Sequence, residues 1–237
     1  MTFDAYTFRA RLMPVFILLL PIGLAFFSFF PITSIASALV GLFSTLSVQG
    51  LLTLLFSEIG RDLGKKKEPG LYEKWGGMPT DFIISLQSPL DRITVERYKN
   101  KLRSLLPDVL FPTLAQEEID IKSGRDAYRS CTNFMREKTR DASKYPLVFK
   151  ENVSYGFRRN LWGMKPSGVA VALMGLIACV VSIVASPKSE YAEVVAWACF
   201  AINAVLLTWW TLRINPAWIK VAGEEYAKQL FATCETL

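Results

Sequence analysis

The chain has 237 residues, of which 51% are hydrophobic and 13% aromatic, and its formal net charge of +6 is reached without a single histidine. The missing histidine removes the commonest general base and the commonest metal ligand, so composition argues against an enzyme and against a zinc or other transition-metal site. No cofactor is expected. The four cysteines have no CxxC spacing, and we expect reduced thiols that pack as small apolar groups.

The first element along the chain is a long uncharged run. Residues 12–57 contain no charged side chain, and the run is more than twice the ~20 residues that a helix needs to cross a bilayer core. Pro31 divides it into two halves that only a tight turn can join. We therefore expect two antiparallel membrane helices in residues 1–57.

A second apolar pair lies near the C-terminus. The segments Pro166–Ser186 and Val194–Leu212 are separated by a short polar piece that contains Lys188. They predict a second membrane hairpin over 166–213, which leaves 58–165 as an inserted domain and 214–237 as a tail.

The basic residues predict the orientation of these spans. Arg9 and Arg11 precede the first span and the basic run Arg61–Lys67 follows the second, whereas the turn at Pro31 has no basic residue. Basic flanks stay on the cytoplasmic side. Both termini and the inserted domain are therefore expected in the cytoplasm. The N-terminal apolar run is too long for a cleavable signal peptide.

The inserted domain is expected to be helical. Paired glycines and a proline in Trp75–Thr80 predict a turn, and no segment alternates with period two. The predicted helices run from Ser88 or Asp91 to about Leu106, from a capping box at Thr113–Gln116, from Ser123 to about Asp141, and over part of Tyr145–Gly163. The fold class is thus an all-α membrane protein, with four transmembrane helices as two hairpins and an inserted helical cytoplasmic domain.

Several residues within the spans have two interpretations. Small residues repeat every three or four positions around Gly175 in the third span and around Ser37 and Ser44 in the second, while Asn203 and Gln49 are amides within apolar helices. Small faces let helices pack closely, and a buried amide needs a hydrogen-bond partner. The alternative is that these residues contact another subunit or line a mildly polar pore.

The inserted domain carries basic and aromatic residues together. Arginine recognises phosphate in a planar fork, and exposed aromatic rings stack on bases. An anionic ligand would use Arg158 and Arg159 beside Tyr155, with Lys65 and Trp75 as further candidates. The alternative is that these charges fix the topology and contact anionic membrane lipids, with the lysines from Lys65 to Lys67 as the lipid set.

The acidic residues Glu117, Glu118 and Asp120 form a further group that could hold a metal or act as an acid and base. They lie on a short polar helix, where we expect them to face solvent.

Two motif-bearing runs carry a family resemblance. Gly60–Thr80 contains Gly-Arg-Asp, Glu-Pro and Trp-Gly-Gly-x-Pro-Thr, and Tyr145–Gly163 contains Glu-Asn-Val-x-Tyr-Gly-Phe-Arg-Arg-Asn. The chain resembles a family of bacterial four-span membrane proteins, and beyond that the membrane effectors of the Hailong antiphage system. This resemblance implies an oligomeric ion channel whose opening stops growth of infected cells. It also implies control by a DNA-like oligonucleotide made by a partner nucleotidyltransferase. It carries over no individual ligand-binding residue.

Together, these features favour a homo-oligomeric, ligand-gated channel or pore of the bacterial inner membrane. Four helices enclose too little space for an ion path, so several subunits are needed, and a tetramer is the first expectation. The alternative is a membrane-anchored scaffold or subunit whose inserted domain binds a cytoplasmic protein partner.

Overall fold

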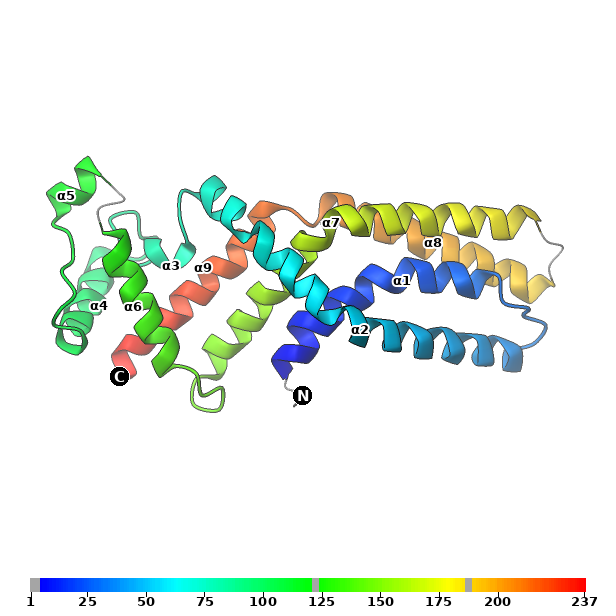
Figure 1. The fold of residues 1–237 in the computed structure, drawn as a ribbon, viewed down its shortest axis with the longest axis horizontal. Coiled ribbons are helices and arrows are strands. Elements are labelled where there is room, and N and C mark those ends of the chain that lie inside the picture. Colours follow the sequence, from blue (N-terminus) through cyan, green and yellow to red (C-terminus); the bar gives the residue numbers. More distant parts are fainter. Residues whose placement is uncertain (1–4, 121–123, 186–188) are drawn as a thin grey trace. The chain divides into compact units, whose positions relative to one another are not determined.

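The computed structural model describes residues 5–120, 124–185 and 189–237. Within these residues every regular element is a helix, which confirms the all-α prediction (Figure 1). The elements are η1 (Thr7–Leu12, a π-helix), α1 (Met13–Ser28), α2 (Ile35–Trp75), α3 (Pro79–Phe82), α4 (Arg92–Leu105), α5 (Leu114–Ile119), α6 (Arg125–Lys138), α7 (Pro146–Ala185), α8 (Glu190–Leu212), α9 (Pro216–Ala232) and η2 (Thr233–Thr236, a 3₁₀ helix).

Four of the helical stretches are long and apolar enough to cross a membrane. They are η1 with α1, the apolar part of α2, the apolar part of α7, and α8. The four-span prediction is therefore confirmed by length and composition. Lys188, in the polar piece between the last two spans, lies outside the described residues.

Two of these helices are longer than the apolar pattern predicts. The second span was expected to end near Ser57 and the third to begin at Pro166, yet α2 continues to Trp75 and α7 starts at Pro146. The apolar segments mark the predicted spans and not the helix ends, because lysine, arginine and glutamate are good helix formers that continue a helix beyond the apolar run. Pro166 removes one backbone hydrogen bond from α7 without ending it.

One compact unit contains residues 1–68 and 156–216. Helix α1 packs against α8, and Figure 1 shows α1, α2, α7 and α8 running beside one another. Small buried side chains lie between these helices, among them Ala25, Cys179 and Cys199. We refer to this part as the membrane unit.

The second compact unit contains residues 69–155 and 217–237 and is referred to as the helical unit. Its core includes Ile84, Leu102, Met135, Leu230 and Phe231. The last two belong to α9, so the segment expected to be a tail supplies a core helix. An apolar residue every three or four positions from Ile219 to Cys234 is the sequence signal for that helix.

Local signals in the helical unit specify its turns and helix starts. Gly76 has φ +82°, a conformation that favours glycine, and ends α2. Asp91 accepts a hydrogen bond from the Thr94 N–H at 2.9 Å, which confirms it as the N-cap of α4. The capping box of Thr113 and Gln116 is also confirmed. Ser123, the expected start of the next helix, lies outside the described residues.

All four cysteines are free and buried, as expected. In the helical unit, burial raises the pKa of the Cys131 thiol to about 11 and that of Cys234 to about 12. Both therefore stay protonated at neutral pH and pack as small apolar groups.

Candidate functional site

The arginine pair expected to bind an anionic ligand lies on α7, just after the point where this helix enters the membrane unit. Arg159 is buried, and its guanidinium Nη1 lies 3.5 Å from Glu68 Oε2 on α2. The Arg159 Nε and Nη2 groups also donate to Asn160 Oδ1, at 3.3 and 3.2 Å. The structure thus gives Arg159 a role in joining α2 to α7, whereas the Arg158 side chain is half-buried.

Asn160 is the residue of this region that sequence reasoning missed. Its Nδ2 donates to the Ala10 carbonyl at 2.7 Å, in the π-helical turn that begins the first span. A π-helical turn shifts carbonyls away from their usual α-helical partners. Asn160 therefore fastens the N-terminal segment to α7, and only its place within the Arg-Arg-Asn motif could have drawn attention to it.

The aromatic candidates lie in the helical unit. Trp75 packs edge-on against Tyr72, with ring centroids 6.0 Å apart, and the Tyr72 and Tyr155 hydroxyls are 3.2 Å apart. Tyr155 and Trp75 thus share Tyr72 as a neighbour. Lys65 is exposed and belongs, with Arg158 and Arg159, to the membrane unit. The five ligand candidates are thus divided between the two compact units.

Helices α2 and α7 approach each other closely at two glycines. A Cβ added to Gly163 would lie 2.3 Å from the backbone nitrogen of Gly64, well inside ordinary contact distance. Gly64 in turn faces Asn160, where an added Cβ would lie 2.4 Å from Oδ1. The crossing next to Arg159 and Glu68 therefore requires glycine on both helices.

A tryptophan and two lysines lie beside this crossing. The Lys67 ammonium is 6.0 Å from the Trp162 ring centroid and the Lys165 ammonium is 5.8 Å from it. Lys165 also donates to the Thr211 and Ile214 carbonyls, at 2.8 and 2.7 Å, at the end of α8. Lys165 thus caps a helix C-terminus.

The two amides within the spans make hydrogen bonds between helices. Gln49 Nε2 of α2 donates to the Phe16 carbonyl of α1 at 3.1 Å. Asn203 Nδ2 of α8 lies 3.5 Å from the Pro21 carbonyl of α1 and 3.4 Å from Cys179 Sγ of α7. Both amides are buried within one chain, which corresponds to the helix-packing interpretation.

The small face of α7 packs inside the same chain. A Cβ already fits poorly at Gly175, since it would lie 2.8 Å from the Pro21 carbonyl oxygen. Further along this face, the Ser182 hydroxyl donates to the Ser28 carbonyl at 2.6 Å. The face therefore holds α7 against α1.

The second span presents two kinds of hydroxyl. Ser37 accepts hydrogen bonds from the Thr33 and Ser34 backbone N–H groups and so caps the start of α2. Ser44 is exposed, as is Ser47, whose hydroxyl donates to its own helix. One turn further on, Gly50 has no atom within 4 Å of the place of an added Cβ. On this outward face of α2, two serines are thus exposed and a glycine has open space beside it.

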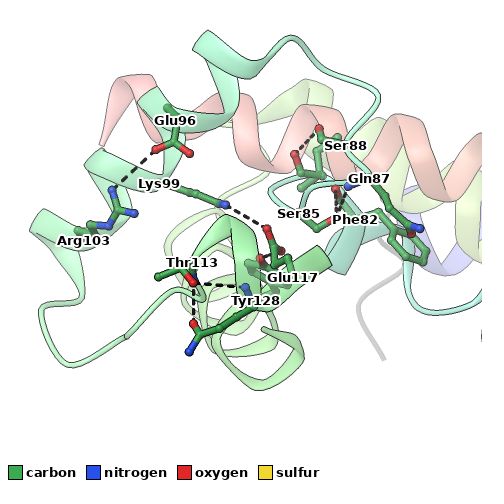
Figure 2. Close-up of polar contacts among 12 residues, drawn as sticks. Phe82, Ser85, Gln87, Ser88, Glu96, Lys99, Arg103, Thr113, Glu117 and Tyr128 are labelled. Atoms are coloured by element: carbon green, nitrogen blue, oxygen red, sulfur yellow. Dashed lines mark hydrogen bonds and ion pairs between the residues drawn. The ribbon is translucent and has the colours of Figure 1, made fainter. Parts of the chain in front are cut away.

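Glu117 does not face solvent as expected. Its side chain is 1% exposed and its Oε2 lies 3.7 Å from the ammonium of Lys99, whose side chain is 4% exposed. The Tyr128 hydroxyl donates to Glu117 Oε1, and Figure 2 shows the three side chains converging from α4, α5 and α6. The expectation was wrong because a six-residue polar helix still buries the face that packs on its neighbours.

Comparisons with known proteins found no match for this chain. No family model matches the chain, and neither a curated protein nor a solved structure matches it.

Proposed function

We propose that the chain forms a homo-oligomeric, ligand-gated ion channel or pore of the bacterial inner membrane, with both termini and the helical unit in the cytoplasm. The observation that carries this proposal is the outward face of α2. Ser44 and Ser47 are exposed there and Gly50 opens onto free space, in the middle of a helix otherwise fit for lipid. Small and hydroxyl-bearing faces suit close contact between subunits and a wettable pore lining.

The buried residues of the membrane unit favour α2 over the other helices for this role. Asn203, Gln49 and Gly175 are all occupied by contacts within the chain. The exposed hydroxyls of α2 are therefore better placed to meet a neighbouring subunit or water. We propose a ring of subunits, a tetramer first, in which α2 faces the axis.

The proposed gating depends on two helices that continue from one compact unit into the other. Helices α2 and α7 each contribute residues to both compact units without a break.

We propose that an anionic oligonucleotide made by a partner nucleotidyltransferase is the signal and that the protein acts as an antiphage effector. The support for this part is the family resemblance of the Trp-Gly-Gly and Arg-Arg-Asn motifs, together with the basic residues near them.

Ion flux from liposomes tests the proposal. The purified chain should release potassium from loaded vesicles, and a charged thiol reagent should block the Ser47→Cys variant. The native cysteines are buried, so they leave the background low. Val184→Cys, at a 78% exposed position of α7, is the matched control and should keep its flux. No flux from the wild type, or a detergent-solubilised particle of monomer size, would refute the channel.

The oligonucleotide needs a separate variant. Arg159→Gln would disturb the contact with Glu68 whatever the ligand, so the test uses Arg158→Gln alone. One charge-assisted contact is worth ~1.5–3 kcal/mol, so its loss should weaken oligonucleotide binding about tenfold or more. An unchanged affinity would place the ligand elsewhere and leave Arg158 as a topology marker.

A scaffold is the second candidate, and exposed apolar side chains of the helical unit favour it. Ile93, Leu110 and Ile119 are 80, 86 and 88% exposed. Exposed apolar side chains mark a protein interface where they gather into one patch. Expression of the chain alone separates the two candidates: depolarisation of the cell membrane supports the channel, whereas an unchanged potential with capture of a folded protein partner supports the scaffold.

A further inference from the structure

A cavity of about 320 Å³ lies in the helical unit, next to the buried pair of Lys99 and Glu117. It is bounded by the segment after α3, the start of α4 and helix α5, the region drawn in Figure 2. Its wall includes both charge types and apolar groups: Arg92, Glu96, Lys99, Glu118, Val95 and Leu114. Ligand sites for small molecules begin at about this size, ~300 Å³.

Lys99 is the unusual member of this wall. Its side chain is only 4% exposed, and the distance of 3.7 Å from its ammonium to Glu117 Oε2 is longer than a hydrogen bond. Glu117 Oε2 accepts no hydrogen bond from the residues that the structure describes, and the Lys99 ammonium also lies 5.9 Å from the Tyr128 ring centroid. A buried carboxylate oxygen that accepts no hydrogen bond is costly, and a ligand donor that reached it would lower that cost.

The other polar groups of the wall define what such a ligand carries. Arg92, at the first position of α4, adds a second cation to the cavity wall, two helical turns before Lys99 on the same helix. Glu118 is an acceptor for N–H donors on the rest of the ligand, and Glu96 is a second acceptor, although its Oε2 also lies 4.0 Å from Arg103 Nη1. The Ser88 hydroxyl is already committed, since it donates to the Ile83 carbonyl at 2.7 Å.

We propose that this cavity binds one small molecule that has a phosphate or carboxylate at one end and N–H donors at the other. Lys99 and Arg92 hold the anionic group, and Glu96 and Glu118 hold the donors. The mixed charges and the small volume do not suit a run of several phosphates. The site is thus distinct from the oligonucleotide contacts proposed above, and its occupancy does not depend on ion conduction.

Calorimetry on the full-length, detergent-solubilised protein tests the site with two probes. Adenosine monophosphate offers a phosphate with the N–H donors of its base, and L-glutamine offers a carboxylate with ammonium and amide donors. Inorganic phosphate alone serves as the reference anion. We expect one probe to bind with one-to-one stoichiometry and more tightly than inorganic phosphate, and its identity tells phosphate from carboxylate.

Two variants and a matched control connect the binding to the cavity. Lys99→Met and Arg92→Gln should each weaken the bound probe about tenfold or more, since each removes a charge-assisted contact. Lys101→Met, on the same helix but outside the cavity wall, should bind as the wild type does. If Lys99→Met fails to fold because Glu117 loses its partner, the exposed Arg92 still provides the test. Binding of neither probe, or unchanged affinity in Arg92→Gln, overturns the proposal.

Discussion

The crossing of α2 and α7 gives the sharpest stability prediction. Gly163→Ala places a Cβ 2.3 Å from the Gly64 nitrogen and 2.6 Å from its Cα. Ordinary contacts between heavy atoms are ~3.5–4.0 Å, so the two backbones must separate by about 1 Å. Overpacking of this kind costs ~1–3 kcal/mol. The separation would also stretch the nearby contact of Arg159 with Glu68, which already measures 3.5 Å.

Gly70→Ala is the matched control for this substitution. It makes the same chemical change within α2, but no atom lies within 4 Å of its added Cβ. Alanine is favoured over glycine within a helix by ~0.5–1 kcal/mol, and this gain is common to both variants. Gly163→Ala should therefore be ~1–3 kcal/mol less stable than Gly70→Ala. Unfolding of the detergent-solubilised chain in increasing SDS, followed by tryptophan fluorescence, measures the difference. Equal stability would show that the helices do not cross at these glycines.

Three further predictions concern other parts of the chain. Gly175→Leu should disrupt packing of α7 on α1, measured by the same unfolding assay, whereas Leu173→Ile, at an exposed position, should be tolerated; equal tolerance would place Gly175 in lipid. Because burial raises the thiol pKa to about 11 in Cys131 and about 12 in Cys234, a maleimide at pH 8 should label neither until the protein is denatured, and rapid labelling of the native chain would contradict their burial. Reporter fusions at Lys188 and at the C-terminus should report opposite sides of the membrane, and a common side would refute the four-span topology.

The membrane part could be predicted in outline from sequence because its physics is local. An uncharged run such as 12–57 has no charged side chain to present to water, and its length sets the number of spans. Helix starts at Asp91 and Thr113 were predictable for the same reason: each cap is made by a side chain three residues from its partner.

The candidate site was less predictable because its contacts join distant segments. Charge and aromatic placement made Arg158 and Arg159 candidates but could not predict that Arg159 contacts Glu68, 91 positions away along the printed sequence. Glu117 illustrates the same limit, since its burial depends on Lys99 and Tyr128 from two other helices.

The sequence by itself therefore determined the fold class, the four apolar helices and the local caps, because periodicity, length and capping act within one helix. Only the tertiary structure decided which polar groups are occupied. It buried Gln49 and Asn203 against neighbouring carbonyls, left Ser44 exposed, and placed Lys99 beside a cavity. Such outcomes depend on how helices far apart in the chain pack together, because a polar side chain in a low-dielectric interior must find its partner on another helix.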